Sequence, residues 1–230
     1  MRVALVDDNA DEIAGIAESL RTSGFDCAIF GSGEELIAAL RRETFDLLLL
    51  DWNMPSMTGV DVLSWARDNI ASPPPVIMLT SRERKEDVIY ALENGAVDYI
   101  RKPEDPDIIC ARIKAAVRKE RSEPAGNSSL SGFEYDTLTQ TVRFGEEVIE
   151  LRQKEFHLAR LLFENLNRPL SRGYILQRVW QSSPDIETRT LDVHVSRLRS
   201  KLGLKPERGV VLRTIFGFGY RLDSCGSDEG

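Results

Sequence analysis

The hydrophobic positions of the first 120 residues alternate between a strand period and a helix period. Short apolar runs typical of strands occupy residues 3–6, 26–30, 46–50, 76–79 and 97–101. Between them, apolar residues recur at helical spacing, as in the stripe Ile13, Ile16, Ala17 and Leu20. Ser32 and Glu35 have the spacing of a capping box and predict the start of the second helix. Five successive strand–helix units predict an α/β domain over residues 1–121, a doubly wound five-stranded parallel sheet with helices on both faces.

The alternation stops after this segment. Residues 122–129 lack periodicity and are rich in turn formers, so we interpret 122–130 as a linker. Short strand-like runs then follow at 133–135, 141–144 and 148–151, helical patterns at 153–165, 172–179 and 187–202, and a closing hairpin at 210–215 and 219–222. This order predicts a smaller α+β domain over residues 131–224. Residues 225–230 are expected to form a disordered tail.

The charges are segregated between the two predicted domains. The chain has 230 residues and a net charge of −7. Residues 1–121 carry 15 basic and 22 acidic side chains, whereas residues 152–221 carry 14 basic and 6 acidic ones. A basic segment behind an acidic domain indicates two partners of opposite kind, one of them nucleic acid.

Membrane and disulfide-based classes are disfavoured. No apolar run approaches the roughly 18 residues that a membrane span needs. The three cysteines, Cys27, Cys110 and Cys225, are far apart and odd in number. This pattern favours a reducing cytoplasm over a disulfide framework or a CxxC metal site.

Unusual polar residues stand where the predicted parallel strands end. Asp7 and Asp8 end the first strand, and Asp51, Thr80 and Lys102 end the third, fourth and fifth. Functional sites of open α/β sheets form at the carboxyl ends of strands. Three converging carboxylates would repel one another, and Mg²⁺ prefers such oxygen ligands. Together with a lysine and a hydroxyl, they could stabilise a phosphoryl group on Asp51.

Each of these residues also has an ordinary interpretation. An isolated aspartate at a strand end is usually a turn former or a helix cap, and a lysine before Pro103 is usually solvated. Five such residues at the ends of four strands of one sheet favour the functional interpretation.

Four motifs in residues 2–121 resemble the receiver domain of response regulators: LVDDN, LLDWNMP, MLTSR and DYIRKP. The resemblance implies that a sensor histidine kinase phosphorylates Asp51. It also implies that Asp8, Asp51 and the backbone carbonyl of Asn53 bind Mg²⁺, with Asp7 supporting the metal through water. Thr80 and Tyr99 would form a switch pair, Lys102 would bind the phosphoryl group, and Pro103 would follow a cis peptide bond.

In the basic half, residues 188–202 form an amphipathic helix when placed at 3.6 residues per turn. Leu191, Val195, Leu198 and Leu202 share one side, which is expected to pack into the core. Another face carries Arg189, Val193, Ser196, Arg197 and Ser200, flanked by Arg199 and Lys201. Arginine can pair with guanine in the major groove and valine can contact a thymine methyl. Alone, the pattern also fits an ordinary charged helix face.

This helix resembles the recognition helix of the OmpR/PhoB family, and residues 131–223 resemble its winged helix-turn-helix domain. Trp180 and the segment 213–220, RTIFGFGY, match the loop and wing patterns of that family. The implied contacts with double-stranded DNA are Arg189, Val193, His194, Arg197, Arg199, Lys201, Arg213 and Thr214. For His194 we expect a backbone or phosphate contact, since no cluster of metal-ligand residues lies near it in the sequence.

The sequence departs from the family pattern at three places. Phe216 stands in the wing where the family often has an arginine, so Arg213 or Arg221 would have to replace it. On the face where the resemblance implies homodimerisation upon phosphorylation, Asp98 and Arg112 match one charge pair, but Val88 and Ile108 replace another and Val97 breaks a third. Glu104 replaces the usual phenylalanine after Lys-Pro, with no consequence that we can derive.

The favoured function is therefore a phosphorylation-controlled transcription factor that is not an enzyme beyond its own phosphoryl chemistry, with RNA polymerase as a further partner. One alternative is a phosphotransferase or phosphatase with an aspartyl nucleophile, but position 53 is asparagine rather than a second acid–base carboxylate. Another is a pure protein-interaction module, which the basic segment disfavours.

Overall fold

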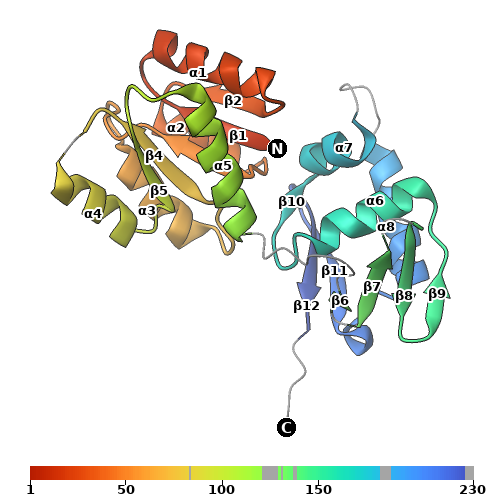
Figure 1. The fold of residues 1–230 in the computed structure, drawn as a ribbon. Helices are drawn as coiled ribbons and strands as arrows, with labels where there is room; N and C mark the ends of the chain where they lie inside the picture. The colour runs from red at the N-terminus through yellow and green to blue at the C-terminus, as the bar shows by residue number, and fades with distance from the viewer. Residues whose placement is uncertain (83, 121–128, 131, 137–138, 182–187, 226–230) are drawn as a thin grey trace. The chain divides into compact units, whose positions relative to one another are not determined.

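The computed structural model describes residues 1–230 except 83, 121–128, 131, 137–138, 182–187 and 226–230. The chain forms two compact units, Met1–Ser122 and Glu123–Gly230 (Figure 1). Most of the predicted linker and tail lies outside the described residues. Of the rest, Ser129 and Leu130 pair as a strand instead of belonging to a linker, and the Cys225 N–H donates to the Gly209 carbonyl at 2.8 Å.

The first unit is the predicted α/β fold. Its strands are β1 (Arg2–Val6), β2 (Asp26–Phe30), β3 (Leu47–Leu50), β4 (Val76–Thr80) and β5 (Asp98–Arg101). Its helices are α1 (Ala10–Thr22), α2 (Gly33–Leu40), α3 (Gly59–Asn69), α4 (Lys85–Glu93) and α5 (Pro106–Glu120). All strand pairs are parallel, in the order β2-β1-β3-β4-β5, which confirms the predicted doubly wound sheet.

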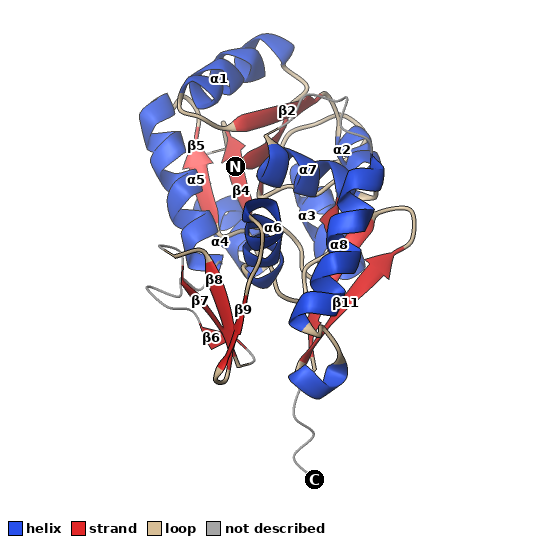
Figure 2. Cartoon of the chain, turned by 90° about the vertical axis from the view of Figure 1, so that its right-hand side faces the viewer, coloured by secondary structure: helices blue, strands red, loops and turns tan. Residues whose placement is uncertain are grey.

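Alternate residues of the central strands enter two separate cores. Val3 and Leu5 of β1 pack with apolar residues of α1 and α5, whereas Ala4 and Val6 pack with α2 and α3. The four leucines of β3 divide in the same way, and all are buried. Helices therefore cover both faces of the sheet (Figures 1 and 2), because side chains of a strand alternate between its faces.

The second helix begins where the capping pair predicted. The Ser32 hydroxyl accepts a hydrogen bond from the Glu35 N–H. The return bond differs from a standard capping box, because the Glu35 carboxylate accepts from the N–H of Gly31 rather than of Ser32. The cap therefore also holds Gly31, the first residue after β2.

The described residues of the second unit form three α-helices and two small antiparallel sheets. Its strands are β6 (Ser129–Leu130), β7 (Phe133–Asp136), β8 (Thr141–Phe144), β9 (Glu147–Ile149), β10 (Leu170–Ser171), β11 (Val210–Ile215) and β12 (Gly219–Ser224). Its helices are α6 (Gln153–Phe163), α7 (Arg172–Trp180) and α8 (Thr188–Leu202), with a 3₁₀ turn η1 (Pro206–Arg208). The three helices and the β11–β12 hairpin confirm the predicted winged helix-turn-helix.

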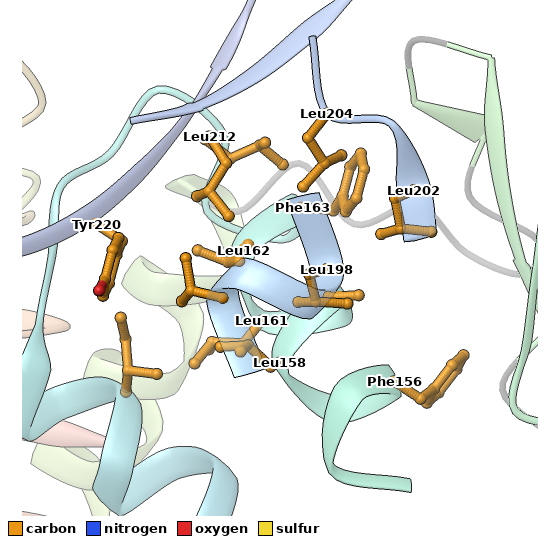
Figure 3. Close-up of a cluster of buried hydrophobic side chains, with 14 of the residues drawn as sticks. Phe156, Leu158, Leu161, Leu162, Phe163, Leu198, Leu202, Leu204, Leu212 and Tyr220 are labelled. Atoms are coloured by element: carbon orange, nitrogen blue, oxygen red, sulfur yellow. The ribbon is translucent and has the colours of Figure 1, made fainter. Parts of the chain in front are cut away.

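The core of this unit lies between α6, α8 and the hairpin. Leu198 and Leu202 of α8 belong to one buried cluster with leucines of α6 and with Leu212 of β11 (Figure 3). All four apolar residues assigned to the inner side of α8 are at most 1% exposed, which confirms that side of the helix. Among the described residues, no helix is long and apolar enough to cross a membrane.

Candidate functional site

Three carboxylates meet at the carboxyl edge of the parallel sheet. Asp7 and Asp8 follow β1 and Asp51 follows β3, its neighbour in the sheet. One oxygen of each lies within 4.8 Å of the others. Asp7 and Asp51 are buried, whereas Asp8 is exposed. The predicted acidic cluster is thus present, with the carboxylate of Asp8 open to solvent.

Lys102, which directly follows the edge strand β5, also belongs to this cluster. Its ammonium donates to Asp7 and lies 3.4 Å from Asp51 Oδ1 and 3.4 Å from Glu12 Oε1. Burial alone would lower the pKa of Lys102, but the three surrounding carboxylates raise it above its ordinary value. The lysine therefore carries a fixed positive charge beside Asp51.

The position of Asp51 is set by backbone contacts. The Asn53 N–H donates to Asp51 Oδ2 at 2.7 Å. The first residue of α3, Gly59, approaches so closely that a Cβ there would lie 2.1 Å from the Asp51 carbonyl oxygen. Only glycine allows this approach. Burial, and after it the charge of Asp7, raise the pKa of Asp51 despite Lys102.

This donor set fits a hard divalent cation. Several carboxylate oxygens converge at one edge, and Lys102 is the single cation that the described contacts place among them. A second positive charge would lower the repulsion between the carboxylates, and Mg²⁺ favours a few carboxylates with remaining sites for water. Asp7, Asp8 and Asp51 together could hold a metal ion, while the particular ligands Asp8, Asp51 and the Asn53 carbonyl stay predictions.

The predicted switch residues, Thr80 and Tyr99, both contact Arg82. Thr80 is fully buried at the end of β4, and its hydroxyl accepts from the Arg82 N–H at 3.4 Å. The hydroxyl of Tyr99 donates to the Arg82 carbonyl at 2.9 Å. Both side chains therefore touch the backbone of the same residue. The Lys102–Pro103 peptide is cis, as the resemblance implied.

Arg82 was not among the site residues predicted from the sequence. Its Nε donates to Asn53 Oδ1 at 2.9 Å, a terminal nitrogen lies 3.4 Å from Asp87, and the guanidinium covers the Trp52 ring at 4.9 Å. Arg82 thus joins the loop after β3 to α4. The only signal in the sequence was an arginine two residues beyond Thr80.

The predicted dimer face carries both charge and apolar surface. Arg112 of α5 donates to Asp98 of β5 at 2.8 Å, so this pair forms within one chain. Ile108 is 44% exposed, whereas Val88 is half-buried. The exposed apolar residues of α4 are instead Ile89, Tyr90 and Leu92, which the sequence analysis did not select.

The outer face of α8 is open, as predicted. Arg189, Val193, Ser196, Arg197 and Ser200 are all exposed. His194 differs from this set because its Nδ1 lies 2.8 Å from the Thr190 carbonyl and its ring packs edge-on against Trp180 at 5.0 Å. Its backbone contact is therefore within its own helix, and its phosphate contact stays a prediction.

Other predicted DNA contacts have partners inside the unit. Arg199 donates to the Leu212 carbonyl at 3.0 and 2.8 Å and to the Thr214 hydroxyl at 3.0 Å. Lys201 pairs at 2.8 Å with Glu155, which is 1% exposed. Arg199 and Lys201 thus help to hold α8 against β11 and α6, and their contacts with DNA stay predictions.

The wing presents an exposed aromatic tip. Phe216, between β11 and β12, is fully exposed. The two arginines considered as its replacement, Arg213 and Arg221, both pair with Asp223. Arg213 remains mostly exposed, so its contact with DNA stays a prediction, as does that of Thr214 beside it.

Comparisons with known proteins agree with this arrangement. Two family models match: the response regulator receiver domain over residues 3–114 and the C-terminal domain of transcriptional regulatory proteins over residues 145–222. The DNA-binding response regulator MtrA of Mycobacterium tuberculosis H37Rv is 37% identical over 220 residues, which cover 96% of either protein. The sensory transduction protein RegX3 of Mycolicibacterium smegmatis is 36% identical over 226 residues, covering 96% of this chain and 98% of RegX3.

Among solved structures, a CheY-like receiver domain protein from Methanospirillum hungatei JF-1 matches 53% of this chain and 96% of its own, with 27% identity and a TM-score of 0.50. The resemblance to response regulators with a receiver domain and a DNA-binding domain, stated from the motifs, is confirmed. The chain belongs to the family of response regulators in which a receiver domain precedes a transcriptional regulatory domain.

Proposed function

We propose that this response regulator accepts a phosphoryl group on Asp51 from a sensor histidine kinase, with Mg²⁺ bound at Asp8, Asp51 and the Asn53 carbonyl. The observation that carries the proposal is the convergence of Asp7, Asp51 and Lys102 at one edge of the sheet. Of its relatives, MtrA is named a DNA-binding response regulator and RegX3 a sensory transduction protein.

The residues of the pocket have distinct parts in this reaction. A carboxylate oxygen of Asp51 attacks phosphorus, and the bond between phosphorus and the donor's leaving group breaks. Lys102 stabilises the negative charge that gathers on the phosphoryl oxygens. Bound Mg²⁺ would neutralise charge on the same oxygens. Asp7 holds Lys102 in place, and Thr80 supplies a hydroxyl that can turn toward the new anion.

We further propose that the second unit binds double-stranded DNA sequence-specifically through the exposed face of α8. Among the described residues, Arg189 and Arg197 have no hydrogen bond or ion pair like those of Arg199 and Lys201, although the charge of Arg197 acts on Glu155. Arg197 would read a base edge, because it lies on the same open face as Val193. Phosphorylation would promote a homodimer through α4, β5 and α5, and the bound dimer would act on RNA polymerase in the cytoplasm.

The test of the DNA-binding function is enrichment of duplexes from a random-sequence pool by the full chain, followed by a salt titration. We expect one sequence to be enriched, and its affinity to fall steeply as salt rises, because phosphate contacts release counterions. A chain that enriches no sequence, or whose binding ignores salt, contradicts this function.

A further inference from the structure

An acidic side chain occupies the open side of the proposed DNA-binding helix. Asp192 of α8 is 48% exposed and directly precedes Val193 in the sequence. A carboxylate near DNA is repelled by the phosphates and weakens binding. Asp192 was not among the site residues predicted from the sequence, and its contacts indicate what it does on this helix.

Asp192 is tied to two other elements. The same oxygen, Oδ1, accepts a hydrogen bond from the Tyr220 hydroxyl of β12 and another at 2.6 Å from Arg172 of α7. The Arg172 guanidinium also covers the Tyr220 ring at 5.2 Å. We call these three residues the Asp192 junction. The hydrogen bonds of the junction lower the pKa of Asp192, so the carboxylate stays charged.

The two partners of Asp192 lie on elements that are joined through the pairing of β10 with β12. β10, which directly precedes α7, pairs with β12 so that Leu170 lies opposite Tyr220. The backbones approach closely there, since a Cβ on Gly219 would lie 2.1 Å from the Leu170 carbonyl oxygen. The Arg172 N–H donates to the Phe218 carbonyl at 3.1 Å. Backbone contacts that do not involve Asp192 therefore hold the chain segments of Arg172 and Tyr220 together.

A second tie lies two helical turns further along α8. Arg199 follows Asp192 by seven residues, which places both on one side of the helix. Its hydrogen bonds to the Leu212 carbonyl and the Thr214 hydroxyl join α8 to β11. The helix is thus bonded to both strands of the hairpin, to β12 through Asp192 and to β11 through Arg199.

We propose that Asp192 is a positioning residue for DNA recognition: it fixes the rotation and axial position of α8 against the hairpin and does not itself contact DNA. Apolar contacts of the inner side are non-directional, whereas the junction supplies directed hydrogen bonds. A recognition group must be held to roughly 0.5 Å and 10–20° to meet its target. The inference rests on the proposed DNA binding.

The test compares two affinities of the full chain, one for the duplex that the wild type enriches from a random pool and one for a shuffled duplex of equal length. In Asp192→Ala, we expect the ratio of these affinities to fall about tenfold, the discrimination of one good base contact. The affinity for the shuffled duplex should not fall, because a negative charge has been removed. Asp192→Asn retains an acceptor for both donors, so its ratio should stay within about twofold of wild type.

Two further variants separate positioning from other roles. Glu207→Gln removes an exposed negative charge of η1 outside the junction and should leave the ratio unchanged. Arg172→Ala should lower the ratio as Asp192→Ala does, whereas the loss of a mere phosphate contact would weaken both duplexes alike. If Asp192→Ala melts below the assay temperature, Tyr220→Phe replaces it, since this change removes only one donor to Asp192.

An Asp192→Ala chain whose ratio equals that of wild type overturns the inference, and so does an Asp192→Asn chain that loses the ratio as fully as Asp192→Ala. Both outcomes leave the proposed DNA binding intact. A wild-type chain that enriches no sequence overturns the proposed function itself, and the positioning role with it.

Discussion

Lys102 and Asp7 form an ion pair across 95 positions of sequence, joining the ends of β5 and β1. Two strands, β3 and β4, lie between β1 and β5 in the sheet. Asp51 directly follows β3, which is the neighbour of β1. The lysine side chain, 9% exposed, therefore spans the edge of the sheet past the proposed phosphoacceptor. A charge that would stabilise a phosphoryl group on Asp51 is thus already present beside that carboxylate.

The first prediction follows from this pair. Lys102→Ala should slow phosphorylation of Asp51 by a small-molecule donor about 10²-fold, because a preorganised charge at the reacting group is lost. The rate is measured by quenched time points and intact mass. Lys114→Ala, which removes an exposed lysine of α5, is the control and should keep the wild-type rate. Equal rates in Lys102→Ala and wild type would show that Lys102 does not stabilise the transition state.

The second prediction concerns base recognition. Arg197→Ala should cost about 1–3 kcal/mol of binding free energy on the enriched duplex and reduce discrimination at one base position. Fluorescence anisotropy on the enriched duplex and its single-base variants measures both effects. Ser200→Ala, on the same exposed face, is the control. If Arg197→Ala weakens enriched and shuffled duplexes equally, Arg197 contacts phosphate instead.

The third prediction concerns the ion pair between Lys201 and Glu155. Because Lys201 pairs with the buried Glu155, Lys201→Ala should lower the unfolding free energy of the second unit by about 1–3 kcal/mol. Hydrogen exchange of the α6 and α8 amides under rising urea measures the loss. Lys205→Ala, an exposed lysine beyond the same helix, should change little. If Lys201→Ala lowers the affinity for DNA without lowering stability, Lys201 acts through a phosphate contact rather than through its ion pair with Glu155.

The same ion pair predicts a dependence on pH. Burial alone would raise the pKa of Glu155, but hydrogen bonds from Lys201 and from the Arg152 N–H outweigh burial and lower it. A carboxyl group with a lowered pKa stabilises the fold above its unfolded pKa, about 4.3, and the stabilisation is lost as the pH falls through the folded value. The second unit should therefore lose stability in acid below about pH 5, and Lys201→Ala should lose less. If the unfolding free energies of the wild type and of Lys201→Ala fall by the same amount as the pH is lowered, this coupling is contradicted.

The fifth prediction concerns the dimer. With beryllofluoride as a phosphoryl mimic, the wild type should dimerise in analytical ultracentrifugation, and high salt should weaken the dimer little because exposed ion pairs contribute under about 1 kcal/mol each. Ile108→Glu, on the exposed apolar surface, should weaken it, whereas Val148→Glu, equally exposed but in the second unit, should not. A wild type that stays monomeric refutes the dimer; an unaffected Ile108→Glu dimer refutes only the apolar contribution.

Regular periodicity explains why so much of the architecture was predictable. The runs that end in Asp7 and Asp51 became neighbouring parallel strands, because apolar residues with turn signals at both ends leave few alternatives in a βα order. Leu191 and Leu198 entered the core because a 3.6-residue period places them on one side of α8.

The ends of long side chains were not predictable in the same way. Arg199 and Lys201 follow the helical period as well as Arg197 does, yet their donors reach β11 and α6. Their partners lie 13 and 46 positions away in sequence, so no local pattern distinguishes a held cation from a free one. Arg82 was missed for the same reason, since its partner Asn53 is 29 positions away.

Intact mass spectrometry after incubation with a small phosphodonor tests the central claim most directly. With Mg²⁺, the wild type should gain one labile phosphoryl group, and it should gain none when the metal is chelated. Asp51→Asn should gain none under either condition, whereas Asp61→Asn, an exposed aspartate of α3, should behave as wild type. An Asp51→Asn chain that gains the same labile group, or a wild type that gains it without metal, would contradict the account.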